Sequence, residues 1–249
     1  MLCRLSCCWI LAAILSCALA QADEPIFLRA DALEDTHPVG APPDDDSEEF
    51  RADLAIVLWM QQTRTEADIA MAVAAVRLDV FSFSDVIGPR FNARTCPQTD
   101  EMFRLITAQA KAVHDPLKDQ HGRARPFQEF PELVFPVIDP PESKSYPSGH
   151  ATRGMTMALL LADLLPEMRS SLIGKGRWFG NSRVVAGVHY PTDIIAGRKL
   201  GEILAKDIIH SEAWRDVRPK LAEEIRQAIR ETSSAADQEL LPALPATAR

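Results

Sequence analysis

The sequence predicts an all-α, single-domain helical bundle. Hydrophobic residues make up 47% of the 249 residues, and few of them alternate with polar residues as a half-buried strand requires. Apolar residues instead recur at the spacing of helices that bury one face. From 48 to 87 neither glycine nor proline interrupts the chain, so we expect two or more consecutive helices there.

The first element is expected to be a signal peptide over residues 1–20. Arg4 precedes an apolar run that ends at Leu15, and an A-x-A exit follows, so we place cleavage after Ala20. The run is too short to span a bilayer. The alternative is a lipoprotein signal centred on Cys17, which the bulky Leu15 disfavours. Either signal implies export, and cleavage after Ala20 would make the mature protein periplasmic or secreted.

Removal of the leader changes the cysteine content and the charge. Four of the five cysteines lie within it, so the exported chain keeps only Cys96, which is either buried or paired between chains, and it has no internal disulfide. The formal charge of −8 becomes −9, because 26 basic residues then face 35 acidic ones. An acidic chain without a basic stripe is not expected to bind nucleic acid. No later segment has eighteen uncharged apolar residues, so no stable membrane span is expected.

The bundle is expected over residues 48–231, between two less regular segments. Residues 21–47 are rich in proline and acids and predict an extended arm, with Ser47 as a helix cap. The composition of residues 232–249 predicts a flexible tail. Further helices are expected over residues 99–113, 149–165 and 191–209, with a last amphipathic helix near Leu221, Ile225 and Ile229.

A long irregular connection is expected between His114 and Pro147, because seven prolines fall in it. A connection of this length inside a compact domain is usually functional. It carries Lys118 and Arg125, and a third cation, Arg183, lies further along the chain. If the three converge, they would offset a phosphate dianion, and each guanidinium could bind two oxygens at once. Each could equally be a solvated surface side chain.

A turn into the helix expected from residue 149 carries Ser148, Gly149 and His150. Backbone N–H groups at the start of a helix can point at an anion, and a glycine lets that anion approach closely. The same residues could serve local structure alone, with Ser148 as a helix cap and His150 as an ordinary first-turn histidine.

His189 and Asp193 lie four residues apart across the start of a predicted helix. Asp193 could accept one ring N–H and leave the other nitrogen of His189 free to attack phosphorus, or it could only stabilise the helix dipole. A metal site at these residues and His150 is disfavoured, because nearby Lys and Arg would oppose a divalent cation. The remaining histidines are expected on the surface or hydrogen-bonded in the core: His37, His114, His121 and His210. Of these, His121 could line the site.

Together these stretches resemble the signature of the acid phosphatase and vanadium haloperoxidase superfamily, which includes the type 2 phosphatidic acid phosphatases. The three blocks occur in order, between Lys118 and Asp193, as K-D-Q-H-G-R-A-R-P, P-S-G-H and S-R-V-V-A-G-V-H-Y-P-T-D. The length, the export signal and the flanking helices are most similar to the bacterial class A non-specific acid phosphatases. The resemblance implies a hydrolase of small phosphate monoesters that needs no metal and no other cofactor.

The resemblance also implies a role for each matching residue. His189 would attack phosphorus, Asp193 would orient it and His150 would protonate the leaving oxygen, after which water would hydrolyse the phosphohistidine. The two histidines must then hold opposite protonation states, which predicts coupled titration and activity on the acidic side of neutral. The residues implied to bind phosphoryl oxygens are Lys118, Arg125, Ser148, Gly149 and Arg183.

Two positions depart from the class A pattern, which usually has Gly before S-Y-P-S-G-H and Thr after it. Here Lys144 and Ala151 stand in those places, which puts the substrate range and membership of class A in question. A vanadium haloperoxidase would hold vanadate on His189, although those enzymes tend to be much longer. A non-catalytic anion binder is disfavoured because no catalytic residue is missing. Lipid phosphatase activity and a homo-oligomer stay open.

Overall fold

The computed structural model describes residues 26–28 and 39–240, and no strand occurs in these ranges. This confirms the all-α fold class. The predicted signal peptide over residues 1–20, with Ala20 and the Cys17 alternative, lies outside the described residues, as does His37 and much of the arm predicted over residues 21–47.

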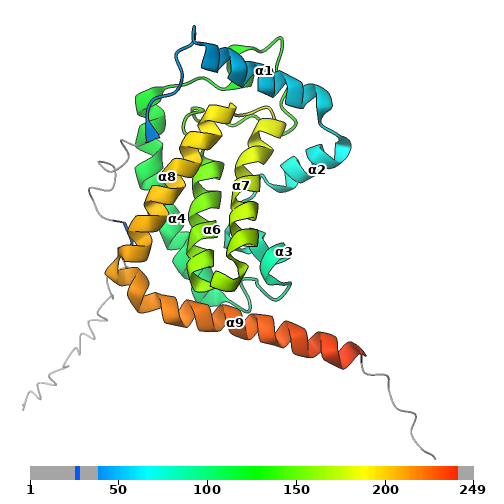
Figure 1. The fold of residues 1–249 in the computed structure, drawn as a ribbon, viewed down its shortest axis with the longest axis vertical. Helices are drawn as coiled ribbons and strands as arrows, with labels where there is room; N and C mark the ends of the chain where they lie inside the picture. Colours follow the sequence, from blue (N-terminus) through cyan, green and yellow to red (C-terminus); the bar gives the residue numbers. More distant parts are fainter. Residues whose placement is uncertain (1–25, 29–38, 241–249) are drawn as a thin grey trace, which may run out of the picture.

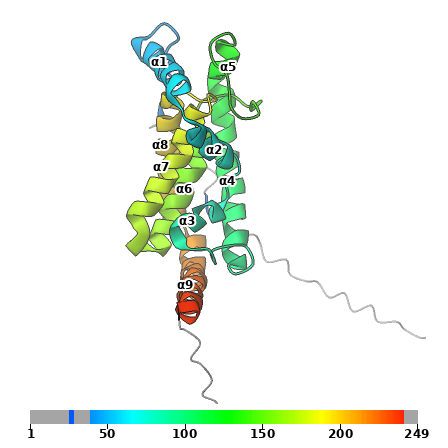
Figure 2. The ribbon, with the colours of Figure 1, turned by 90° about the vertical axis from the view of Figure 1, so that its right-hand side faces the viewer.

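Three helices form the centre of the molecule, with α6 between α7 and α8 (Figure 1). Figure 2 shows α4 beside this layer and α9 across one end of it. The helices are α1 (Glu48–Thr63), α2 (Glu66–Ala74), α3 (Ser84–Ile87), α4 (Pro97–His121), α5 (Pro126–Glu129), α6 (Gly149–Leu164), α7 (Arg169–Val185), α8 (Pro191–His210) and α9 (Glu212–Leu240), with short 3-10 turns η2 (Val80–Phe83) and η3 (Pro166–Met168).

The helices predicted over residues 48–87 are confirmed as α1, α2 and α3. Ser47 accepts the backbone N–H of Phe50 at 3.1 Å and caps α1, as expected. Thr65 and Asp68 form a capping box that starts α2.

The helix α4 is longer than the one predicted over residues 99–113, because it continues to His121. Pro116 lies inside it without ending it, and the neighbouring Leu117 is buried. Packing of this face compensates for the backbone hydrogen bond that a proline cannot donate. Lys118 therefore lies on a helix rather than in the irregular connection where the proline count placed it.

Glycines let α6 approach its two neighbours closely. A Cβ on Gly176 of α7 would lie 2.7 Å from the carbonyl oxygen of Gly154 on α6. A Cβ on Gly197 of α8 would lie 2.5 Å from the carbonyl oxygen of Ser148, where α6 begins. Only a hydrogen fits in these positions, so the glycines set where the start of α6 lies against α8.

The largest apolar cluster lies between α4, α6 and α9 and contains Cys96, which has no exposed surface. Trp214 of α9 packs edge-on against Phe103 of α4, with ring centroids 6.3 Å apart, and donates its indole N–H to Asp163 at 3.0 Å. Of the two alternatives for Cys96, the structure agrees with burial.

The helix α9 continues past residue 232, where composition predicts the start of a flexible tail, and ends at Leu240. Residues 241–249 lie outside the described part of the chain. None of the described helices is both long enough and apolar enough to cross a membrane.

Candidate active site

A cavity of about 560 Å³ opens between α4, the start of α6 and the loop over residues 141–144. Six of the eight residues singled out in the sequence line it, from five separate segments: Lys118, Arg125, Gly149, His150, Arg183 and His189. The other two, Ser148 and Asp193, are fully buried behind its wall, where each contacts a neighbouring element.

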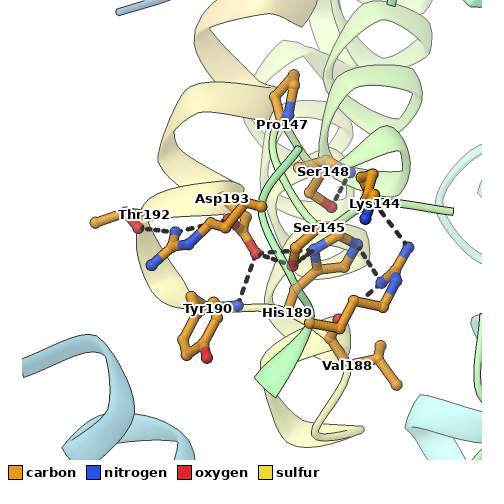
Figure 3. Close-up of polar contacts among 12 residues, drawn as sticks. Lys144, Ser145, Pro147, Ser148, Val188, His189, Tyr190, Thr192 and Asp193 are labelled. Atoms are coloured by element: carbon orange, nitrogen blue, oxygen red, sulfur yellow. Dashed lines mark hydrogen bonds and ion pairs between the residues drawn. The ribbon is translucent and has the colours of Figure 1, made fainter. Parts of the chain in front are cut away.

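His189 is held by Asp193, as its spacing predicts (Figure 3). The distance from Nδ1 of His189 to Oδ2 of Asp193 is 3.0 Å, and the same oxygen accepts the hydroxyl of Ser145 at 2.6 Å and the backbone N–H of Tyr190 at 2.9 Å. Because a carboxylate accepts, Nδ1 carries the ring proton, and the lone pair of Nε2 points to Arg125 Nη1 at 3.1 Å. His189 thus presents a free nitrogen to a cation at the cavity wall.

Asp193 is itself held in place by a hydrogen-bonded ion pair with Arg123, a residue that was not among those predicted from the sequence. Arg123 donates from Nη1 to Asp193 Oδ1 at 2.8 Å and from Nη2 to Asp53 Oδ2 at 2.9 Å. Asp53 also accepts the backbone N–H of Thr192 at 3.0 Å, and the guanidinium lies 4.2 Å from the ring centroid of Tyr190. Burial raises the pKa of Asp193, whereas Arg123 and the other donors lower it. A closed network thus ties α1 to the start of α8.

A sequence signal for this network exists in α1. Asp53 lies on the same face as Phe50 and Val57, and all three are buried. An acid on the buried face of an amphipathic helix needs a partner, and the fold supplies Arg123, which lies within the K-D-Q-H-G-R-A-R-P stretch. The sequence positions of Asp53 and Arg123 do not indicate that the two side chains pair, so the pairing is seen only in the folded structure.

The three predicted cations converge on the cavity, but they are held in different ways. Lys118 donates to the backbone carbonyls of Lys144 and Ser145, the latter at 3.2 Å. Arg125 donates to the carbonyls of Ser143 at 2.6 Å and of Val188 at 2.7 Å. Loop carbonyls therefore position both side chains, and Lys144, one of the two departures from the class A pattern, takes part through its backbone.

Arg183 differs, because its Nε and Nη1 atoms are buried and find no hydrogen-bond partner among the described residues. Burial, followed by repulsion from Arg125, lowers the pKa of Arg183 to about 10 and that of Lys118 to about 7; burial also lowers the pKa of Arg125 to about 10. Buried cations with unsatisfied donors are costly unless an anion binds between them. The cavity therefore has the electrostatics of an anion site.

The start of α6 adds backbone donors to the cavity. Ser148 accepts the N–H of Ala151 at 3.4 Å and donates its own N–H to the carbonyl of Asp193 at 3.0 Å, so it acts as the helix cap. The N–H groups of Gly149 and His150 belong to the first turn, where no earlier carbonyl of the helix can accept them. A Cβ on Gly149 would lie 3.1 Å from the His114 ring, so glycine keeps this edge of the cavity open.

His150 is the second histidine of the cavity. Its Nε2 lies 3.0 Å from the carbonyl oxygen of Val76 and donates its proton there, which leaves Nδ1 as the ring nitrogen without a partner among the described residues. Burial, then Arg183 and Arg153, lower the pKa of His150 to about 3. The pKa of His189 is also well below its usual value, first through burial and then through Arg125. Both imidazoles are neutral in the empty cavity at ordinary pH.

Of the other histidines, His114 is hydrogen-bonded in the core as expected but also lines the cavity, and His121 does not line it. His114 is buried and hydrogen-bonded, to Asp115 at 3.0 Å and to the carbonyl of Pro147 at 3.1 Å, but it also lines the cavity, which its sequence context did not indicate. His121 does not line it, because its ring packs edge-on against Tyr146 at 5.0 Å. In the described part of the chain, no group of three or more His, Cys, Asp or Glu side chains is arranged to hold a metal ion.

Comparison with known proteins gives a consistent result. A family model described as the PAP2 superfamily matches residues 102–216, which include every residue above from Lys118 to Asp193. A non-specific acid phosphatase of Salmonella typhimurium is 27% identical over 220 residues, which cover 83% of this chain and 86% of that protein. A lipid A 1-phosphatase of Rhizobium etli is 39% identical over 88 residues, which cover 34% of this chain and 38% of that protein.

Among solved structures, the PAP2 type phosphatidylglycerolphosphate phosphatase of Bacillus subtilis is similar with a TM-score of 0.48 and 22% identity. That similarity covers 66% of this chain and 86% of the other.

Proposed function

Since residues 102–216 match the PAP2 superfamily model, we propose that this chain is an exported acid phosphatase that hydrolyses small phosphate monoesters through a phosphohistidine at His189. The observation that carries the proposal is the cavity that Lys118, Arg125 and Arg183 line together with His189, whose unprotonated Nε2 lies 3.1 Å from Arg125 Nη1. A nucleophile next to fixed positive charge is what displacement at phosphorus requires.

In the first step the phosphoryl oxygens bind Lys118, Arg125 and Arg183, together with the first-turn amides of α6. The anion takes the place of the contact between Arg125 and Nε2 of His189, which frees the lone pair. That lone pair forms the P–N bond while the P–O bond breaks, and the leaving oxygen receives a proton from Nδ1 of His150. Asp193 stabilises the positive charge that develops on the phosphorylated ring, because its carboxylate accepts the Nδ1–H of His189.

In the second step His150, now neutral, accepts a proton from water. The resulting hydroxide attacks phosphorus and the P–N bond breaks, which returns its electron pair to Nε2 of His189. Phosphate leaves, His150 returns to solvent the proton that was taken up on substrate binding, and both imidazoles are neutral again.

Binding of the substrate causes His150 to take up the proton that the first step needs. In the empty cavity the neighbouring cations and burial hold His150 neutral. A phosphate dianion offsets those cations, so it raises the pKa of His150 and favours the imidazolium. The enzyme and substrate together therefore take up a proton, and we expect turnover to be favoured on the acidic side of neutral.

Phosphate release from p-nitrophenyl phosphate between about pH 4 and 8, with EDTA present, tests the proposed function. We expect turnover that is favoured by acid, resists the chelator and is almost abolished by His189→Ala. His210→Ala is the matched control, because His210 is exposed and does not line the cavity. Chelator-sensitive turnover, or a His189→Ala enzyme that stays largely active, would contradict the proposed mechanism.

Export is proposed from the leader sequence, with Gln21 as the first residue of the mature chain. The test is the N-terminal sequence of the protein recovered from the periplasmic fraction or the medium of the producing cells. Gln21 at the N-terminus supports cleavage after Ala20, whereas a lipid-modified Cys17 or a retained leader contradicts it.

A further inference from the structure

The cavity extends well beyond the residues that would bind the phosphoryl group. Its second half runs along α4 and α6, away from Lys118, and is lined by Thr107, Ala110, Lys111 and Arg153. Contacts between the two helices show that they run in opposite directions here, because Lys118 meets Ser145, and His114 meets Pro147 and Gly149. One turn further along, Lys111 of α4 and Arg153 of α6 face the same part of the cavity.

This second half lies on the side from which a leaving group departs. Arg153 follows His150 by three residues, so it lies about one turn along α6 from the proposed general acid. Its charge is close enough to lower the pKa of both His150 and Arg183. An alcohol whose oxygen is protonated by His150 would therefore extend toward Arg153.

Arg153 has donors to offer. Its Nε donates to the carbonyl of Gly149 at 3.3 Å, which orients the guanidinium, and within the described residues its terminal nitrogens make no hydrogen bond or ion pair. Lys111 differs, since it forms an ion pair with Asp115 at 3.2 Å and its side chain is 71% exposed. Arg153 is thus the cation of this half of the cavity whose terminal donors are uncommitted.

We infer that Arg153 forms a subsite for a second anion, so that the enzyme favours phosphate monoesters whose alcohol also carries a phosphate or carboxylate group. A guanidinium fixed through Nε presents its two terminal nitrogens to a planar or tetrahedral anion, which is the arrangement that bidentate recognition needs. The inference rests on the proposed function for the direction of the leaving group, but the anion subsite itself does not require turnover.

Matched substrate pairs test the preference. Hexane-1,6-diol bisphosphate is compared with hexyl phosphate, and 2-phosphoglycolate with 2-hydroxyethyl phosphate, so that each pair differs in the second anion. In at least one pair, we expect wild-type kcat/KM to be higher for the member with the second anionic group. The difference should exceed the twofold statistical advantage of two equivalent phosphates. Equal kcat/KM within both pairs would overturn the subsite.

Variants then assign the preference to Arg153. Arg153→Met should lower kcat/KM for the substrate with the second anion by roughly tenfold or more, which corresponds to a lost charge-assisted hydrogen bond. The kcat/KM for the partner without the second anion should change less than about threefold. Arg153→Lys should recover part of the preference. Arg104→Met is the control, because Arg104 lies on α4 outside the cavity with a 73% exposed side chain. Equal losses on both members of a pair would overturn the assignment.

Binding separates failure of the subsite from failure of the proposed function. Calorimetry compares hexane-1,6-bisphosphonate with hexylphosphonate, neither of which can be hydrolysed at a P–C bond. Tighter binding of the bisphosphonate that is lost in Arg153→Met supports the subsite even if no monoester is turned over. Normal turnover of hexyl phosphate together with equal binding of both phosphonates refutes the subsite and leaves the proposed function intact.

Discussion

Arg123 joins two acids, Asp53 and Asp193, each 70 residues from it in the sequence. The side chains of all three are at most 4% exposed. A buried charge needs partners on every side, so the position of Asp193, and through it the orientation of His189, depends on a residue of α1. The geometry of the nucleophile is thus set in part from outside the cavity.

Asp53→Asn should test this dependence. Removal of one charge from the buried network is expected to cost about 3 kcal/mol of unfolding free energy and to lower kcat more than it raises KM, because the phosphate-binding side chains remain. Chemical denaturation and steady-state kinetics with p-nitrophenyl phosphate measure both effects. Asp85→Asn is the control, since Asp85 forms an exposed ion pair with Lys175 and should cost at most about 1 kcal/mol. A fully active, fully stable Asp53→Asn protein would contradict the role of the network.

The lowered pKa of His150 makes the stability of the empty folded protein depend on pH. The unfolded chain binds a proton on this histidine near pH 6.5 and the empty folded protein only near pH 3. The contribution of His150 to the free energy of unfolding is therefore fully present above about pH 6.5 and is lost as pH falls toward 3. A bound dianion reverses this trend, because it raises the folded pKa.

Sulfate binding should consequently take up protons. Sulfate remains a dianion from about pH 5 to 8, so any uptake belongs to the protein, to Lys118 near its pKa of about 7 and to His150 at lower pH. We expect its affinity to rise, and its stabilising shift of Tm to grow, as pH falls through this range. Calorimetry in buffers of different ionisation enthalpy measures the uptake. His150→Asn should reduce it at pH 5 and His210→Asn should not, whereas proton release on binding would refute the pKa assignments.

At the scale of helices, close packing of α6 against α7 and α8 holds the start of α6 in place. Ala151 belongs to this packing: it is fully buried, and a Cβ on Gly180 or Gly197 would lie 3.2 Å or 2.9 Å from its own Cβ. A larger residue at position 151 would have to fit the same narrow space. The departure from the class A pattern at Ala151 thus coincides with a close contact of α6 with α7 and α8 near the cavity.

Gly197→Ala should separate α6 from α8. The new Cβ meets the carbonyl of Ser148, a backbone atom that can move only with the start of α6, so we expect a loss of about 1–3 kcal/mol in stability and a lower kcat/KM. Gly174→Ala in α7 is the matched control. Its Cβ would meet nothing within 4 Å, so it should stabilise the helix by about 0.4–1 kcal/mol. If Gly197→Ala behaved like Gly174→Ala in thermal unfolding, the packing argument would fail.

Local sequence patterns predicted most helices but missed the extent of α4 and the contacts of three side chains. Apolar spacing and caps located α1, α2, α6 and α8, since these signals lie within a few residues of one another. The predicted extent of α4 was wrong because seven prolines placed the start of an irregular connection at His114, whereas burial of the neighbours of Pro116 outweighs the missing hydrogen bond. The lining role of His114 and the pairing of Arg123 with Asp53 depend on contacts between distant segments, which no local pattern encodes.

For the whole molecule, the chain carries a formal charge of −8, yet its cavity gathers the cations Lys118, Arg125, Arg153 and Arg183. The blocks that bear Lys118, Arg125 and Arg183 were recognisable in the sequence because they occur together and in order, whereas Arg153 lies outside them. Their convergence was not, since the segments meet only when α4 packs beside α6 and the loop over residues 141–144 closes the cavity. The net negative charge of the chain should disfavour large polyanions at the same site.

Cys96 gives a prediction for the mature protein as a whole. Since this thiol has no exposed surface, we expect one thiol per mature chain that reacts with Ellman's reagent only after denaturation, and a Tm that reducing agent leaves unchanged. Thiol counts with and without guanidinium provide the measurement. A disulfide-linked dimer on a non-reducing gel would contradict the buried position.

Rapid quench into alkali during turnover of ³²P-labelled p-nitrophenyl phosphate tests the central claim most directly, because phosphohistidine survives alkali and is lost in acid. We expect label on the protein that is stable in alkali and labile in acid, that maps to His189 and that is absent from His189→Ala. His150→Asn should retain more of it, since His150 is the proposed base of the second step. Label on another residue, or turnover without labelled protein in either enzyme, would contradict His189 as the nucleophile.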